Sequence, residues 1–144
     1  MRKLLTIGWI LLLSMVMVSG PGSANAEDSG VLSRAHGRMA DALKQGDADA
    51  LASCYTQDAS LSFPLRPDIQ GRAEIKRQMS YVIGLGIRSF HIIEDDIFVG
   101  ADVAIQGGTC IFYNETGQEI NRSRFYTVWH RVDGRWLIYR DFVV

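Results

Sequence analysis

The sequence has few residues of the types that build metal sites. Its 144 residues include only two cysteines and three histidines. Cys54 and Cys110 are far apart, and His36, His91 and His130 are isolated, without HxxxH, HxH or CxxC spacing. Protein metal sites usually draw on such closely spaced ligands. The sequence therefore predicts no metal site, and it contains no motif for a cofactor.

The two cysteines leave two interpretations open. An oxidising compartment would permit one disulfide between Cys54 and Cys110. In the alternative, both are small buried apolar residues. A Cα separation well beyond about 7 Å would exclude the bridge.

Positive charge is also scarce. The chain has 15 Lys and Arg against 16 Asp and Glu, a net charge of −1 at pH 7, and no run of basic residues. Binding to nucleic acid needs concentrated positive charge, and binding to a membrane surface commonly uses a basic amphipathic helix. We therefore expect no nucleic-acid partner, and no membrane association once the N-terminal segment described next is removed.

Long apolar runs are missing except at the N-terminus. Basic residues 2–3 precede the mostly apolar residues 4–18, and the small residues 24–26 (Ala-Asn-Ala) follow a Gly-Pro-Gly break. This order is typical of a secretory signal peptide, and the run is shorter than the roughly 20 residues that span a bilayer. We expect a signal peptide over 1–26 and a secreted or periplasmic domain over 27–144. A retained N-terminal anchor is the alternative.

The hydrophobic pattern of the first half predicts helices interrupted by one strand. Apolar residues recur at helical spacing, Gly46 ends the first helix, and Asp47 caps the second. Gly84 and Gly86 end the third helix. The predicted ranges are helix Val31–Lys44, a short helix from Asp47 to Tyr55, strand Ala59–Phe63 and helix Arg72–Ile83.

The second half predicts four strands. The pair Gly107-Gly108 indicates a bulge or bend, and Asp133-Gly134 is a strong signal for a tight turn. A further turn is expected at residues 114–117. The predicted strands are Arg88–Val99, Ala101–Tyr113, Gln118–Val132 and Arg135–Val144.

The last two predicted strands are apolar on both faces, whereas a sheet with one wet face should alternate. Helices can cover one face, and a second subunit would cover the other, which otherwise is a large exposed apolar patch. We expect a symmetric homodimer through residues 118–132 and 135–144. The predicted faces are Phe125, Thr127 and Trp129 opposite Tyr126, Val128 and His130, and then Trp136, Ile138 and Phe142 opposite Leu137, Tyr139 and Val143.

This order of elements predicts an α+β domain. Three helices toward its N-terminal side would pack on one face of a strongly curved antiparallel sheet and enclose a cone-shaped pocket. Alternation along the first strand places Leu61 and Phe63 on the same side, toward the helices. The expected lining suits a small hydrophobic molecule. It consists of Met39, Tyr55, Phe63, Met79, Phe90 and Phe112.

Three stretches carry a family resemblance: ALKQGDADALASCYTQDASLSFP, IQGRAEIKRQM and VDGRWLIYRDF. They resemble the nuclear transport factor 2-like superfamily, and within it the SnoaL-like and ketosteroid isomerase-like domains. The resemblance covers nearly all of residues 31–144 and implies the cone-shaped fold. The superfamily includes isomerases, dehydratases, polyketide cyclases, epoxide hydrolases and non-catalytic binding or assembly domains, so the fold implies no single function.

The resemblance also implies where an isomerase would carry its catalytic groups. A ketosteroid isomerase, which is an established example of pKa tuning, uses an Asp base, a Tyr and a protonated Asp. The resemblance places these at Phe63, near Met39, and near Thr127 or Val128. Because these side chains cannot do that work, we expect no steroid isomerase chemistry by that route.

Tyr55, His130 and Asp141 are the candidate catalytic residues. The Tyr55 hydroxyl could orient a ligand or donate a proton, or Tyr55 could pack in the core with its hydroxyl at the surface. His130 and Asp141 would face each other across a hairpin if the register allows, because one residue of slip reverses the face. The alternative is a cross-strand charge pair on the dimer side. His36 could be an acid or base or a partly buried structural residue.

Three functions are compatible with these residues. The first is an exported protein whose apolar pocket binds a small hydrophobic ligand. The second is a lyase, isomerase or cyclase acting on a small hydrophobic substrate, which needs at least two polar groups that converge inside the cone. The third is a non-catalytic dimeric interaction module of the cell envelope. The sequence shows no assembled acid/base pair, so ligand binding is the primary expectation and catalysis is left open.

Overall fold

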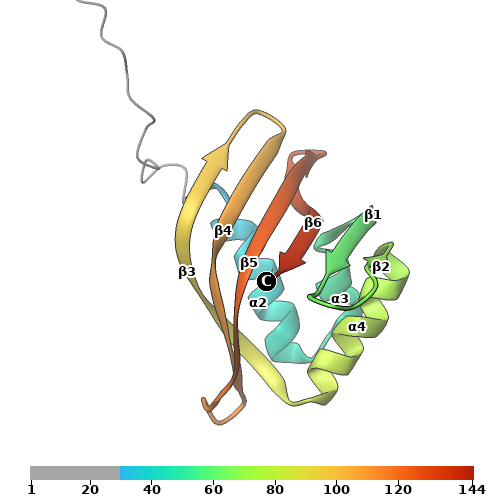
Figure 1. Cartoon of the computed structure of the whole chain (residues 1–144), viewed down its shortest axis with the longest axis vertical. Helices are drawn as coiled ribbons and strands as arrows, with labels where there is room; N and C mark the ends of the chain where they lie inside the picture. Colours follow the sequence, from blue (N-terminus) through green and yellow to red (C-terminus); the bar gives the residue numbers. More distant parts are fainter. Residues whose placement is uncertain (1–29) are drawn as a thin grey trace, which may run out of the picture.

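Helices precede most of the strands in the computed structural model, which describes residues 30–144 (Figure 1). The predicted signal peptide lies outside the described residues. The predicted order of elements is confirmed, with one addition, because the short strand β2 lies in a stretch where no strand was predicted. Their bounds are α2 Ser33–Gln45, α3 Ala48–Ala52, β1 Tyr55–Ser62, β2 Ile69–Gln70, α4 Arg72–Gly84, β3 Ile87–Val99, β4 Val103–Asn114, β5 Glu119–Val132 and β6 Arg135–Val143.

The break between α2 and α3 forms as the sequence predicts. Gly46 adopts a left-handed conformation with φ of 66°, which glycine reaches at no steric cost. The backbone N–H of Asp47 donates to the carbonyl of Ala42 at 2.9 Å. The carboxylate of Asp47 in turn accepts the N–H of Ala50 at 2.9 Å and so caps α3. These bonds turn the chain within two residues, and α3 packs against both α2 and α4.

The first strand begins earlier than predicted. Tyr55 is its first residue, opposite Ile138 of β6, and is not the end of the short helix. Pairing starts immediately after α3, because the Ile138 N–H donates to the carbonyl of Cys54 at 2.9 Å. The pair formed by β1 and β6 is parallel. The expectation of a wholly antiparallel sheet is therefore wrong at this one pair.

The strands form one curved sheet in the order β2-β1-β6-β5-β4-β3. In Figure 1, α2 lies behind β4, β5 and β6, and α4 lies beside β1 and β2. The bend predicted at Gly107-Gly108 is present. The extra residue lies on the neighbouring strand β3, where the register shifts between Glu94 and Asp96. A Cβ on Gly108 would come 2.3 Å from the carbonyl oxygen of Ile93. Only glycine permits this close approach of the two backbones.

Both predicted hairpin turns are confirmed. Asp133 and Gly134 have φ of 50° and 76°, the conformation of a two-residue turn that suits the sheet twist. In the β4–β5 turn, the side-chain oxygen of Asn114 accepts the N–H groups of Thr116 at 3.1 Å and Gln118 at 2.8 Å.

A bulge in β6 changes which side chains face the helices. Trp129 of β5 is opposite Ile138, but the preceding Val128 is opposite Arg140, so Tyr139 is an extra residue. One extra residue reverses the alternation that follows it. The faces predicted for β6 beyond Tyr139 are therefore wrong.

The core lies between the helices and the concave face of the sheet. Its most deeply buried apolar side chains are Leu32, Leu43, Ile75, Trp129 and Ile138. The opposite, convex face keeps large apolar side chains exposed. No helix within residues 30–144 is long and apolar enough to cross a bilayer.

Candidate functional site

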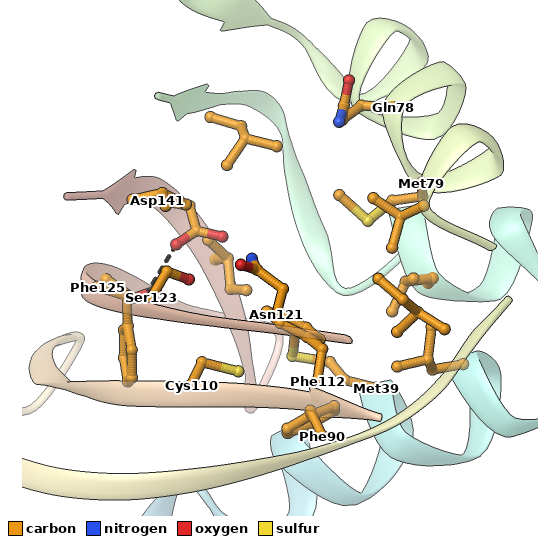
Figure 2. A pocket seen from close by; sticks show the side chains of 18 of the residues that line it. Met39, Gln78, Met79, Phe90, Cys110, Phe112, Asn121, Ser123, Phe125 and Asp141 are labelled. Atoms are coloured by element: carbon orange, nitrogen blue, oxygen red, sulfur yellow. Dashed lines mark hydrogen bonds between the residues drawn. The ribbon is translucent and has the colours of Figure 1, made fainter. Parts of the chain in front are cut away.

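A cavity of about 430 Å³ lies between α2, α4 and the concave face of the sheet (Figure 2). Figure 2 shows Met39 of α2 and Met79 of α4 at this cavity, with Phe90 and Phe112 on the neighbouring strands β3 and β4. The lining is mostly apolar. It includes each of the residues predicted from the sequence, namely Met39, Tyr55, Phe63, Met79, Phe90 and Phe112.

The exposed members of the lining mark the mouth of the cavity. Tyr81 and Leu85 lie at the end of α4, and Ile120 and Asn121 lie at the start of β5. The buried members, such as Trp129, mark its floor. A ligand would therefore enter between α4 and the β4–β5 turn.

The first polar group at the cavity is a carboxylate held by two hydroxyls. Tyr55 donates from its hydroxyl to Oδ2 of Asp141 at 2.9 Å, and Thr127 donates to Oδ1 at 3.1 Å. Tyr55 is 3% exposed and Thr127 is 4% exposed. Asp141 is half-buried and points into the cavity in Figure 2. The Tyr55 hydroxyl is thus inside the protein, and the interpretation that placed it at the surface is wrong.

The electrostatics of this group follow from its burial. Burial raises the pKa of Asp141, while the hydrogen bonds from Tyr55 and Thr127 oppose the shift. Burial and the Asp141 charge raise the pKa of Tyr55 well above its usual value, so its hydroxyl stays protonated. Burial and the same charge raise the pKa of Cys110, which also lines the cavity, to about 12. Asp141 is therefore the member of this group that loses its proton at the lowest pH.

A second polar group lies on the other side of Thr127. Gln106, which is 1% exposed, donates from its amide nitrogen to Glu94 at 2.7 Å, and its amide oxygen is 3.1 Å from Nε2 of His36. Since an amide oxygen only accepts, this pairing puts the His36 proton on Nε2. Burial lowers the pKa of His36, so the ring is neutral at pH 7. The ring packs edge-on against Trp129 at 5.5 Å.

The two polar groups form one row across the sheet. Gln106 of β4 is opposite Thr127 of β5, which is opposite Asp141 of β6. The indole nitrogen of Trp129, one pleat deeper on β5, is buried and has no hydrogen-bond partner among residues 30–144. The floor of the cavity therefore has a polar row beneath apolar walls.

Sequence reasoning missed Gln106 and Glu94. The available signal was a polar side chain at position 106, in an otherwise apolar part of a strand. That signal can be interpreted only once the strand register is known, because the register decides whether Gln106 faces the cavity.

His130 does not reach the cavity. It is opposite Leu137, whereas Asp141 is opposite Thr127. Its ring stacks on Tyr139 at 4.0 Å with an interplanar angle of 18°, and the Arg140 guanidinium lies 3.6 Å from the centre of the Tyr139 ring. The expected meeting of His130 and Asp141 is wrong because the bulge at Tyr139 sends them to opposite faces.

The positions implied by the steroid isomerase resemblance do lie at the cavity. Phe63, Met39 and Thr127 are all part of the lining. The cavity of this protein does contain a carboxylate and a phenol. They come from Asp141 and Tyr55, on the adjacent strands β6 and β1.

The two cysteines are thiols in this structure. Cys54 is buried and its thiol donates to the carbonyl of Ala50 at 3.6 Å, while Cys110 is half-buried at the cavity. Within residues 30–144, no three His, Cys, Asp or Glu side chains gather as a metal site would require.

A family model of the SnoaL-like domain matches residues 37–139. The chain belongs to the SnoaL-like domain family. Its fold is also that of solved structures described as NTF2-like. One from Novosphingobium aromaticivorans, described as having a cystatin-like fold, is 18% identical over 81% of this chain and 80% of its own, with a TM-score of 0.65. One from Shewanella oneidensis MR-1, described as of unknown function, is 17% identical over 80% and 97%, with a TM-score of 0.66.

A third similar structure comes from Catenulispora acidiphila and is described as a complex with S-DNPA. It is 17% identical over 83% of this chain and 93% of its own, with a TM-score of 0.65. No curated protein matches the chain.

Proposed function

We propose that this SnoaL-like domain binds a small, largely apolar molecule in its cavity and holds it by a hydrogen bond to Asp141. The observation that carries the proposal is one fixed carboxylate at the floor of an apolar cavity. A volume of about 430 Å³ lies within the usual range of small-molecule sites. The complex of a similar fold with S-DNPA supports this use of the cavity.

The Asp141 carboxylate selects the chemistry of the ligand. Tyr55 and Thr127 each occupy one acceptor position on a group that has about four. An ionised carboxylate can therefore accept one more hydrogen bond from a hydroxyl or N–H group of the ligand. It would repel a ligand carboxylate or phosphate in a site of low polarity. The ligand class is therefore apolar molecules with a hydrogen-bond donor.

Fluorescence titration with 2-naphthol tests this proposal, because this probe is apolar and carries one hydroxyl. Phe63→Ala removes part of the wall, and we expect about tenfold weaker binding from the lost apolar contact. Tyr55→Phe frees one Asp141 oxygen and changes the carboxylate position. We expect the affinity for 2-naphthol to change severalfold. Leu65→Ala, in the same loop but fully exposed, is the matched control. If Phe63→Ala binds 2-naphthol as wild type does, the cavity is not the site.

A second candidate is acid–base catalysis on such a ligand, as in an isomerase, dehydratase or cyclase. It is favoured by one observation, the hydrogen bond between Asp141 and Tyr55 inside the cavity. A carboxylate with a raised pKa can accept a proton from carbon, and a protonated phenol can donate to the oxygen that becomes negative.

Deuterium exchange tests this chemistry without the natural substrate. The apolar ketone 2-tetralone has acidic C–H bonds beside its carbonyl. Asp141 would remove such a proton and return a deuteron from D₂O. Once Asp141 is protonated, the Tyr55 hydroxyl would turn from it and donate to the enolate oxygen. We expect wild type to exchange deuterium into 2-tetralone faster than buffer alone. Asp141→Asn should give only the buffer rate. Equal exchange by both proteins would reject Asp141 as the base.

We also propose that the chain is exported and cleaved after Ala26. The basic start, the apolar run and the small-residue site support this together. Mass spectrometry of the mature protein in an envelope or secreted fraction should find a chain that begins at Glu27. Recovery of the intact chain from the cytosol would contradict it.

A further inference from the structure

A second hollow, separate from the apolar cavity, is lined by four arginines. It has a volume of about 450 Å³ and lies between α2 and the β5–β6 hairpin. We call it the arginine groove. Arg34 and Arg38 come from α2, and Arg131 and Arg135 come from the two sides of the hairpin turn. Its remaining lining is Gly30, Val31, Ala35, Gly134 and Trp136.

The fold explains why residues about 100 positions apart in the sequence meet here. Arg34 and Arg38 are four residues apart, so they lie on one face of α2. Beside the Asp133-Gly134 turn, Arg131 is opposite Trp136 and Arg135 is opposite Val132, and both arginines border the hollow. Arg38 joins the two elements, because its Nη2 donates to the carbonyl of Trp136 at 3.0 Å. No local run of basic residues reveals this cluster, which is why the sequence gives no sign of it.

The positive charge in the groove is not neutralised by the described part of the chain. None of the four arginines forms an ion pair within residues 30–144, whereas Arg77, Arg122 and Arg124 each have an acidic partner. The Asp133 carboxylate, between Arg131 and Arg135 in sequence, pairs with neither. The Nε atom of Arg38 is buried and also lacks a hydrogen-bond partner in the described part of the chain. Four arginines without an ion pair among the described residues therefore line the same hollow.

We propose that the arginine groove binds the phosphoryl group of a phosphomonoester. A guanidinium group presents paired donors that match phosphate oxygens, and a doubly charged group suits several cations better than a single carboxylate does. The groove is larger than a phosphate ion, and the apolar side chains of Val31, Ala35 and Trp136 leave room for an organic part. Its concave shape and four charges favour one small group over the extended backbone of a nucleic acid.

Calorimetry on the full-length chain at low salt tests this site with phenyl phosphate as the probe. The test variant is Arg34→Gln/Arg135→Gln, since both side chains are exposed and Arg38, which bonds to Trp136, is left in place. The matched control is Arg77→Gln/Arg122→Gln, which removes the same charge from exposed positions elsewhere. We expect the test variant to bind at least tenfold more weakly than wild type, and the control to stay within about twofold.

Two further arms identify the source of the phosphoryl group. Glycerol 2-phosphate in solution and phosphatidylcholine vesicles with or without phosphatidic acid present the same headgroup chemistry. If the test variant binds glycerol 2-phosphate more weakly than wild type, the ligand is a soluble phosphomonoester. If its binding is weaker only with phosphatidic acid vesicles, the ligand is a lipid. Equal binding by wild type and the test variant in every arm overturns the proposal, as does binding to an oligonucleotide alone.

Discussion

The Asp141 carboxyl group lies at a site that disfavours its charge. Surrounding apolar atoms withdraw it from water, and the hydroxyls of Tyr55 and Thr127 compensate for only part of this loss. Burial of a well-packed side chain without a carboxylate would cost less free energy on folding. A carboxyl group at the floor of the cavity is consistent with the proposed contact between Asp141 and a ligand.

This cost predicts how stability depends on pH. The unfolded pKa of Asp141 is near its ordinary value of 3.8 and the folded pKa is higher. Between these two values the folded state binds more protons than the unfolded state, so the free energy of unfolding falls as pH rises from about 4 through the folded pKa. Asp141→Asn should lack this fall. Urea unfolding at a series of pH values measures it.

The exposed loop carboxyl Asp68 provides the control for that series, because Asp68→Asn makes the same chemical change at the surface. Its pH dependence should match wild type. A wild-type curve that rises through this range, parallel to that of Asp141→Asn, would show that the carboxyl carries no burial cost.

Single residues were predictable from the sequence where their role is local. Asp47 as a cap, Gly46 as a helix end and Asp133-Gly134 as a turn follow from their own chemistry. The convergence of Tyr55 with Asp141 was not predictable, because it depends on pairing between residues 86 positions apart. His130 was misplaced for the same reason.

At the scale of elements, two bulges decide what the sheet presents. The extra residue Tyr139 turns Asp141 inward, and the register shift between Glu94 and Asp96 bends β3 over Gly108. Neither strand carries a sequence signal that fixes which residue is extra. Periodicity alone therefore predicted strand ranges well and strand faces poorly beyond each bulge.

The close approach at Gly108 gives a direct test. Gly108→Ala would place a methyl group 2.3 Å from the Ile93 carbonyl oxygen, and we expect a loss of about 2 kcal/mol in the free energy of unfolding. Gly37→Ala is the opposite control, since Gly37 lies within α2 with open space around its Cβ position. The free energy of unfolding of Gly37→Ala should rise by about 0.5–1 kcal/mol, because alanine has a higher helix propensity than glycine. Chemical denaturation of both variants measures the contrast, and equal effects would contradict the packing described.

At the scale of the whole molecule, the sequence was sufficient for the fold. The order of helices and strands, the helix break and the apolar pattern all indicated a cone-shaped sheet closed by helices. Six expected lining residues lie at the cavity because their positions depend on element order and not on fine register. The arginine groove could not be predicted, since its members come from both ends of the domain.

The convex face of the sheet is consistent with the homodimer that the sequence predicts. Ile105, Tyr126 and Phe142 are each about 40% exposed there, on three neighbouring strands. We expect sedimentation at micromolar concentration to show a dimer, and Ile105→Glu to give a monomer because it would bury a charge. Leu65→Glu, on an exposed loop, should remain dimeric. A wild-type monomer under these conditions would contradict the proposal.

The central claim is that Asp141 accepts a hydrogen bond from an apolar ligand in the cavity. The most direct measurement compares the affinities of 2-naphthol and 2-methoxynaphthalene, which differ in the donor. Wild type should prefer 2-naphthol by about tenfold, since a hydrogen bond to a charged group contributes about 1.5 kcal/mol or more. Asp141→Asn should reduce that preference severalfold, because a neutral acceptor is weaker. Equal affinity of wild type for both probes, or an unchanged preference in Asp141→Asn, would contradict the account.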